Sequence, residues 1–260
     1  MEDIELLSPG QRLKRIRKIL NVNQKELAGK KFSKNYISMF ENDKRKINII
    51  NAIYLSDKIN KLAKQKGIDM NVSASLFLKT EKDMAKDKCL EWLTYVESRN
   101  NISTYEVNSN LYKVILLSTK YGLDEYKAKA LFLKAKNEFL RNHFNCAITL
   151  FLESLIYYSK LDDYISISDV YKYIGIILYN KGNFSEGLVY FNLAESMLAR
   201  NKEKDNSRIE DIKYRKALTF YKLGQYEIAN NIIQKISNIN GNINDKLLEL
   251  SNKINNFIAS

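Results

Sequence analysis

The stretch that decides the fold of the N-terminal region is QKELAGKKFSKNYISMFE, residues 24–41. Ala28 is small enough for two helices to cross at close range, and Asn23 and Ser33 can each cap a helix at its N-terminus. Three apolar residues at suitable spacing can lock the two helices together: Leu27, Ile37 and Phe40. The stretch therefore predicts two short helices joined by a tight turn.

Longer amphipathic helices are predicted on both sides of this stretch. The first runs from Ser8 to Leu20, with Ser8 as its N-cap and Pro9 at the first helical position. The second runs from about Asn48 to Lys66 and ends at Gly67. Its inward face is expected to carry Ile49, Ile53, Ile59 and Leu62. The chain has one proline and nine glycines in 260 residues, so we expect an all-α protein.

The segment from Gln24 to Glu41 resembles the XRE-type helix-turn-helix of phage-repressor-like regulators. The resemblance implies that its second helix enters the major groove of double-stranded DNA by its N-terminal end. Gln24 would bond a phosphate and set the register on the duplex. The residues expected to contact bases or phosphates are Arg12, Lys14, Arg15, Gln24, Lys25, Ser33, Lys34, Asn35, Tyr36, Ser38, Lys44 and Arg45.

The distribution of charge agrees with a polyanionic partner. The net charge is +12, and residues 1–70 carry 16 Lys and Arg against 8 Asp and Glu. The other 190 residues hold 26 basic against 22 acidic side chains. A basic excess at one end is typical of nucleic-acid binding, although a lysine-rich solvated surface would give the same charge.

Beyond Gly67 the pattern changes to repeated amphipathic segments. Residues 1–67 form the predicted DNA-binding domain, residues 68–80 a connection, and residues 81–260 a repeat domain of about four to five helix pairs. Small residues recur at spacings of 40 and 42 residues: Ala147, Gly187 and Ala229. These repeats resemble the tetratricopeptide repeat, which implies a right-handed solenoid of antiparallel helix pairs.

The turn between Ala28 and Ser33 is one residue shorter than in the commonest repressors. This form, with tetratricopeptide-like repeats behind it, is similar to the peptide-sensing regulators of Gram-positive bacteria, the Rgg, PlcR, PrgX and NprR group. That resemblance implies a homodimer that binds a two-fold operator. It also implies that the inner helices hold a short signalling peptide, which alters DNA binding. One departure from the group is Ile47, where many relatives have proline.

The peptide contacts that the resemblance implies lie on the first helix of each repeat. Asparagine can satisfy the N–H and C=O groups of an extended peptide, and aromatic pockets can take its side chains. The candidates are Asn110, Lys129, Phe132, Lys136, Asn137, Lys172, Tyr179, Asn180, Tyr214, Tyr221 and Lys222. Each of them could instead be a surface residue or part of the repeat core.

Two other functions stay open. The repeats could serve only for dimerisation or for docking another protein, or the whole chain could be an adaptor whose N-terminal domain no longer binds DNA. An enzyme is not expected, because His143 has no acid or nucleophile at catalytic spacing. Cys89 and Cys146 lack metal-ligand spacing, so no metal or cofactor is expected. Without a signal peptide or an apolar span, a soluble, cytoplasmic protein is expected.

Overall fold

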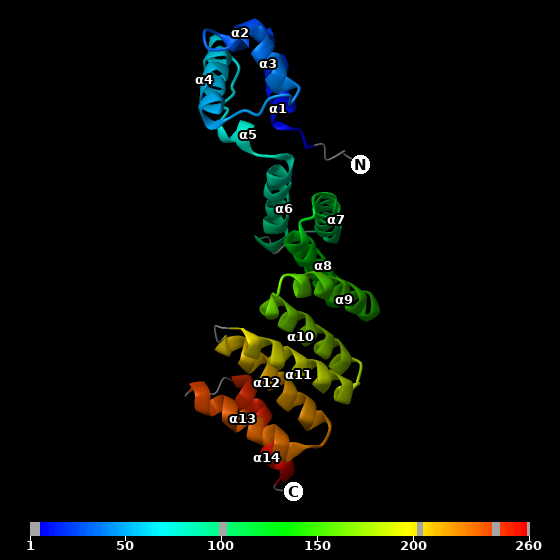
Figure 1. The fold of residues 1–260 in the computed structure, drawn as a ribbon. Coiled ribbons are helices and arrows are strands. Elements are labelled where there is room, and N and C mark those ends of the chain that lie inside the picture. Colours follow the sequence, from blue (N-terminus) through cyan, green and yellow to red (C-terminus); the bar gives the residue numbers. More distant parts are fainter. Residues whose placement is uncertain (1–5, 99–102, 202–204, 241–244, 259–260) are drawn as a thin grey trace. The chain divides into compact units, whose positions relative to one another are not determined.

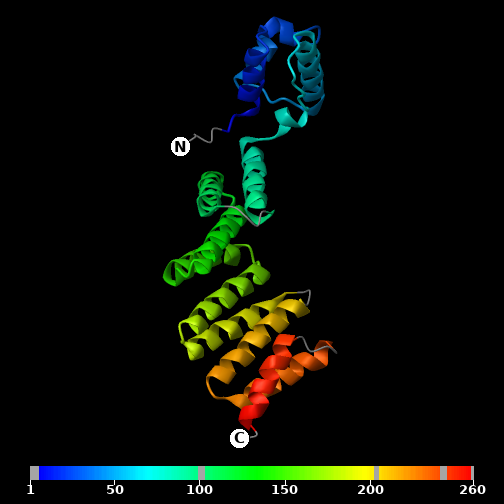
Figure 2. The same cartoon turned by 180° about the vertical axis from the view of Figure 1, so that it is seen from behind.

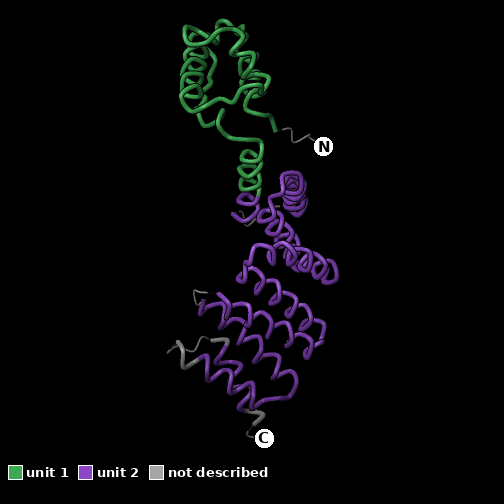
Figure 3. Tube along the Cα trace, in the orientation of Figure 1, with its two compact units in different colours: residues 1–92 green, residues 93–260 purple. Residues whose placement is uncertain are grey.

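The computed structural model describes residues 6–98, 103–201, 205–240 and 245–258. Within these ranges the regular elements are all helices, which confirms the predicted all-α class (Figures 1 and 2). The chain divides into two compact units, residues 1–92 and residues 93–260 (Figure 3).

The first unit is built from short helices whose ends are capped as the sequence predicts. Ser8 accepts a hydrogen bond from the Gln11 amide at 3.1 Å, and Ser33 accepts one from the Tyr36 amide at 3.2 Å. Asn23 and Asn48 cap the second and fourth helices in the same way. The helices are α1 (Pro9–Ile19), α2 (Gln24–Ala28), α3 (Lys34–Glu41), α4 (Ile49–Gln65), α5 (Ser75–Leu78) and α6 (Glu81–Ser98), whose last residues belong to the second unit.

The core of the first unit gathers the apolar residues that were expected to lock the helices. The fully buried side chains include Leu13, Leu27, Ile37, Phe40, Leu55 and Ile59. The expectation for the start of α4 was wrong, because Ile49 is 61% and Ile53 49% exposed. The buried face of α4 is set by Ala52 and Leu55. Ile53 follows Ala52 by one residue and so points about 100° away from it.

The second unit consists of successive antiparallel helix pairs. Its helices are α7 (Thr104–Tyr121), α8 (Asp124–Leu140), α9 (Phe144–Lys160), α10 (Tyr164–Asn180), α11 (Phe184–Arg200), α12 (Asn206–Lys222), α13 (Tyr226–Asn240) and α14 (Asp245–Ile258). Neighbours in the chain pack against each other most extensively in α8 with α9, α10 with α11, and α12 with α13. The predicted helical hairpins with a period near 40 residues are therefore confirmed.

Small residues set how closely the helices of a pair approach. Ala147, Gly187 and Ala229 are all buried on the second helix of their pair. On the first helix of one pair, a Cβ added to Gly175 would lie 2.7 Å from the ring of Phe191 in α11. The aromatic ring therefore fills the space that glycine leaves, as the repeat pattern predicts.

The turn inside each pair repeats as well. The residues at this turn are Asn142, Gly182 and Gly224, and their φ angles are 61°, 82° and 73°. Glycine and asparagine tolerate this left-handed backbone, which ends the first helix and reverses the chain. The spacing of 40 and 42 residues is therefore carried by the turns as well as by the core.

Candidate functional site

The turn between α2 and α3 is held against α4 by one tyrosine. Gly29 has a φ of 58°, and a Cβ there would lie 2.5 Å from the Tyr54 hydroxyl. That hydroxyl donates a hydrogen bond to the Ala28 carbonyl oxygen at 3.0 Å. Glycine is thus required both by the backbone conformation and by the close approach of Tyr54.

Aromatic rings fix the orientation of α3. Phe32 stacks on Tyr36 with 5.3 Å between ring centroids, and it meets Phe40 and Tyr54 edge to face. The guanidinium of Arg45 lies 4.3 Å from the centroid of the Tyr36 ring. Such contacts stabilise a cluster beyond the burial of its surface. The N-terminal end of α3 is therefore held on a rigid support.

A buried ionic cluster joins α1, α2 and α3. Glu41, whose side chain is 1% exposed, accepts hydrogen bonds from Arg17 Nε at 2.5 Å and Arg17 Nη2 at 3.1 Å. Gln24 Nε2 donates to Glu41 Oε2 at 2.8 Å. The hydrogen bond that Arg17 donates to Glu41 raises the pKa of Arg17 above its ordinary value. Because Glu41 of α3 accepts hydrogen bonds from both Arg17 of α1 and Gln24 of α2, the cluster fixes how the three helices meet.

Most of the residues expected at DNA lie at the surface. Those classed as exposed are Arg15, Lys25, Ser33, Lys34, Asn35, Lys44 and Arg45, and the half-buried ones are Lys14, Gln24, Tyr36 and Ser38. Lys34 and Asn35 form the first turn of α3, and Ser33 caps that helix. The exposed set therefore includes the helix end that the helix-turn-helix interpretation directs at the major groove.

Gln24 and Ser38 are among the expected DNA contacts that also have hydrogen-bond partners within the protein. Gln24 gives one amide hydrogen to Glu41, which leaves its second N–H for a phosphate. Asn42 Nδ2 donates to the Ser38 carbonyl oxygen at 2.8 Å and lies 3.5 Å from the Ser38 hydroxyl. The first bond ties the Gln24 side chain to Glu41, and the second ties the Asn42 side chain to the backbone of α3.

Arg12 departs from the expected phosphate contact. It is 7% exposed and donates to the carbonyl oxygens of Ser8 and Lys79. Burial lowers the pKa of Arg12, and the nearby Asp43 opposes that effect. Because α1 carries Arg12 on the face that packs against α5, its guanidinium ties those two helices together and is not available to a phosphate.

In the second unit, three of the predicted peptide contacts line one cavity. Phe132, Lys136 and Lys172 meet in a cavity of about 620 Å³. Its walls come from α8, α10 and the start of α12, which are the first helices of successive pairs. The remaining lining residues are Asp169, Tyr173, Asp205, Ser207, Arg208 and Asp211. The volume is typical of pockets that hold small ligands.

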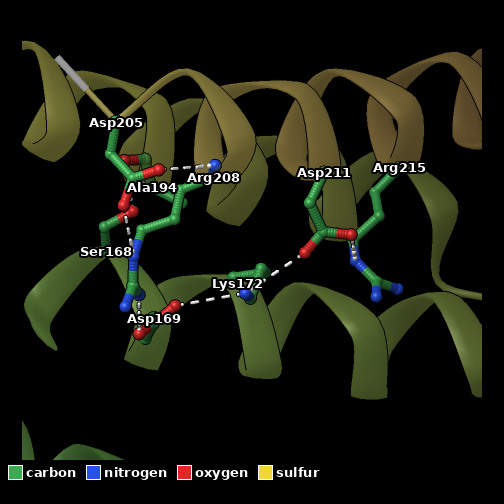
Figure 4. Close-up of polar contacts among 8 residues, drawn as sticks. All are labelled: Ser168, Asp169, Lys172, Ala194, Asp205, Arg208, Asp211 and Arg215. Atoms are coloured by element: carbon green, nitrogen blue, oxygen red, sulfur yellow. Dashed lines mark hydrogen bonds and ion pairs between the residues drawn. The ribbon is translucent and has the colours of Figure 1, made fainter. Parts of the chain in front are cut away.

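One wall of this cavity is an ionic network across α10 and α12 (Figure 4). Lys172 Nζ lies 3.1 Å from Asp169 and 3.2 Å from Asp211. Arg208 pairs with Asp169 and, at 2.9 Å, with Asp205. Asp211 also accepts from Arg215 Nε at 3.1 Å, which extends the network along α12. The network bridges two neighbouring helix pairs and leaves its carboxylates matched by cations.

The cavity is also lined by aromatic rings, and Lys172 Nζ lies 5.8 Å from the centroid of the Tyr173 ring. The rings of Phe132 and Tyr173 are 5.7 Å apart, and Tyr173 stacks on Phe151 at 5.3 Å. The ammonium of Lys136 lies 6.0 Å from the Phe132 centroid and 5.8 Å from the Tyr173 centroid. The cavity thus places charged groups beside an apolar surface.

The other predicted peptide contacts lie elsewhere. Tyr179 and Asn180 line a smaller cavity of about 90 Å³, and burial raises the pKa of Tyr179. Lys129 pairs with Glu97 at 2.8 Å, and Asn137 donates to Asn108 at 3.3 Å. Asn110 donates to a carbonyl of its own helix.

The remaining three candidates lie near the C-terminal pairs. Tyr214 and Tyr221 pack against the core of α12, α13 and α14, and Lys222 is exposed. None of these three lines the 620 Å³ cavity. The structure therefore does not gather the eleven candidates at one place.

Sequence reasoning missed the acidic half of the cavity. Asp169 and Asp211 stand 42 residues apart, which is the spacing of Gly187 and Ala229 in the same two repeats. An acidic residue therefore recurs at the same repeat position on the first helices of two successive pairs, and this recurrence could have predicted both residues from the sequence. Asp205 and Arg208 carry no such periodic signal, because they belong to the N-terminal cap and first turn of α12.

His143 and the cysteines take structural positions. The expectation that His143 has no acidic partner was wrong, because its Nδ1 lies 2.7 Å from Glu138 Oε2. His143 is exposed at the turn before α9. Cys89 is buried and Cys146 exposed. In the part of the chain that the structure describes, no three His, Cys, Asp or Glu side chains gather as metal ligands would. No helix in the same residues has the length and apolar character needed to cross a membrane.

Comparison with known proteins supports the reading of the first unit. Residues 10–82 match a family described as "Helix-turn-helix domain", which confirms the helix-turn-helix predicted between Gln24 and Glu41. No curated protein matches the chain.

Three solved structures illustrate what the chain is similar to. Bacillus thuringiensis PlcR in complex with the peptide PapR7 and DNA is 14% identical, with 95% of this chain and 81% of that chain covered and a TM-score of 0.39. BtubC from P. vanneervenii is 13% identical over 90% and 94%, with a TM-score of 0.46. The PrgX/iCF10 complex is 18% identical over 95% and 96%, with a TM-score of 0.35. PlcR and PrgX belong to the group that the sequence resembles.

Proposed function

We propose that this chain is a transcription regulator that binds double-stranded DNA through α3 and receives in its second unit a short signalling peptide, which alters DNA binding. The observation that carries the proposal is the exposed polar start of α3, presented by a helix-turn-helix whose helices are locked by Glu41. In this function the protein acts in the cytoplasm as a homodimer on a two-fold operator, and it is not an enzyme.

The proposal that the protein binds DNA rests on which side chains at α3 are exposed. Lys34 and Asn35 are exposed in the first turn of α3, where side chains of this motif reach base edges. Asparagine can make paired hydrogen bonds to adenine, whereas lysine near the backbone contributes mainly charge. Arg15, Lys44 and Arg45 are exposed cations suited to phosphates.

Selection from a pool of random double-stranded DNA tests this half. The intact protein should enrich a two-fold sequence, and Asn35→Ala should relax the preference at one position per half-site by about 1–3 kcal/mol. Lys34→Ala should weaken binding to all sequences. Lys61→Ala, an exposed cation on α4, is the matched control and should bind as the parent does. No enrichment by the parent protein would favour the adaptor function.

The proposal that the second unit receives a peptide rests on the cavity between α8, α10 and α12. Its walls offer donors, acceptors and aromatic surface together, which an extended peptide needs. The test is mass spectrometry of small molecules that remain bound to the protein purified from its native host. A peptide whose retention is lost in Tyr173→Ala, but not in Tyr226→Ala on α13, supports the proposal.

A second candidate function for the repeats is dimerisation or protein docking alone. The exposed face of α7 favours it, because Tyr105 is 81%, Tyr112 50% and Leu116 45% exposed along one side of that helix. Sedimentation of Tyr112→Lys and Leu116→Glu tests the point. A change from dimer to monomer with unchanged peptide retention would show that the two functions use different surfaces.

A further inference from the structure

Within the described part of the chain, one of the cations that line the cavity between α8, α10 and α12 has no carboxylate partner. Three carboxylates and three cations line it. Lys172 and Arg208 pair with Asp169, Asp205 and Asp211, as Figure 4 shows. Among the residues that the structure describes, Lys136 makes no ion pair. Its ammonium group lies over the rings of Phe132 and Tyr173.

This arrangement favours an anionic group over a cationic one. Each carboxylate of the network already pairs with at least one cation of the protein, so a cationic ligand would compete with Lys172 or Arg208 for it. An anion needs no such exchange at Lys136. A half-buried ammonium paired with a carboxylate forms a charge-assisted hydrogen bond, which is stronger than a neutral one.

The aromatic rings beside Lys136 favour a ligand that has an apolar group next to its anionic group. Phe132 packs edge to face on Phe151 at 5.5 Å between centroids, and Tyr173 stacks on the same ring. These rings are held in place by the core, so they present a preformed apolar wall directly beside Lys136. A ligand that places an apolar side chain next to its carboxylate would use both features.

We infer that Lys136 binds a ligand carboxylate while Phe132 and Tyr173 hold an adjacent apolar side chain. This inference rests on the proposed peptide-receiving function and names the part of the peptide that enters the cavity. The carboxylate comes either from the peptide C-terminus or from an acidic side chain, since the two present the same chemistry to an ammonium group.

The test uses three pools of synthetic peptides about seven residues long, which extend over roughly 23 Å. The first pool ends in phenylalanine with a free carboxylate and contains no acidic side chains. The second is identical but C-terminally amidated. The third is amidated and carries one glutamate beside an apolar residue. The intact protein is incubated with each pool, and retained peptides are measured by mass spectrometry.

Retention from the first or the third pool should exceed retention from the second by about tenfold, the usual scale for one charge-assisted hydrogen bond. Which pool is retained identifies the source of the carboxylate. Lys136→Gln should remove the difference, and Lys136→Arg should keep most of it. Lys134→Gln is the matched control, because Lys134 lies on α8 but does not line the cavity.

Two outcomes would overturn the inference, and they are distinguishable. Equal retention of the neutral amidated pool, or unchanged retention in Lys136→Gln, means that peptides bind without a carboxylate at Lys136. The peptide-receiving function then survives. Retention of no pool by the parent protein removes that function and this inference with it.

Discussion

At the scale of single residues, Gly10 of α1 lies against the backbone at the C-terminal end of α3. A Cβ there would lie 2.1 Å from the Phe40 carbonyl oxygen, and the Gly10 amide donates to Asp43 at 2.9 Å. Gly10→Ala should therefore lower the free energy of unfolding by about 2 kcal/mol or more, because the backbone at Phe40 would have to shift to make room for the added Cβ. Urea denaturation measures it. Gly67→Ala, in open space with a φ of 67°, should cost only about 1 kcal/mol.

The two thiols give a second residue-scale prediction, which concerns pH. Burial raises the pKa of Cys89 to about 11, whereas Cys146 is exposed in the first turn of α9. The thiolate is the reactive form, so at about pH 8 iodoacetamide should modify Cys146 and spare Cys89. Intact-mass measurement should show one label on the folded protein and two after unfolding. Fast labelling of folded Cys146→Ser would contradict the burial of Cys89.

At the scale of helices, Gly175 and Phe191 set the approach of α10 to α11. Gly175→Ala would place a Cβ 2.7 Å from the Phe191 ring and should cost about 1–3 kcal/mol of stability. Phe191→Leu should be destabilising alone, yet partly rescue Gly175→Ala, because the two residues share one space. A double-mutant cycle by thermal denaturation measures the coupling. Strict additivity of the two changes would contradict the contact.

The turn between α8 and α9 offers a stabilising change. Asn142 has a φ of 61° at the position that Gly182 and Gly224 occupy in the later pairs. Asn142→Gly should therefore raise the free energy of unfolding by a few tenths to about 1 kcal/mol, because glycine adopts this backbone without strain. Asn142→Val should lower it by more than that. Equal stability of the two variants in urea denaturation would contradict the left-handed turn.

Much of the architecture at this scale could be predicted from the sequence, because its signals are local. Capping at Ser8 and Ser33 depends on a side chain within three residues of the amide that it satisfies. The helix pairs follow from small residues at a fixed period, such as Ala147 and Gly187. The exposure of Ile53 could not be predicted in this way, because it depends on which face of α4 packs against the other helices.

The candidate site was less predictable, because it depends on contacts between distant residues. The sequence predicts Arg12 as a surface cation. In the structure it is buried against α5 and donates a hydrogen bond to the carbonyl oxygen of Lys79, 67 residues further along the chain. Asp169 and Arg208 become partners only after two helix pairs have stacked. Phe132, Lys136 and Lys172 were found because they follow the repeat register, whereas Asp205 does not.

At the scale of the whole molecule, DNA binding should depend strongly on salt. The net charge of residues 1–70 is positive, and several exposed cations flank α3. Each phosphate contact should contribute about 0.9 to the negative slope of log affinity against log salt concentration. Replacing Lys44 and Arg45 together by alanine should reduce that slope by about 2 in a fluorescence-anisotropy titration. An unchanged slope would exclude both as phosphate contacts.

In the proposed function, peptide binding in the second unit alters DNA binding by the first, and one measurement tests this coupling most directly. Affinity for the selected DNA is measured with and without a saturating peptide retained by the cavity. We predict a change of at least about fivefold, and the same factor when DNA is used to change peptide affinity. Identical DNA affinity in the presence and absence of bound peptide would contradict the account.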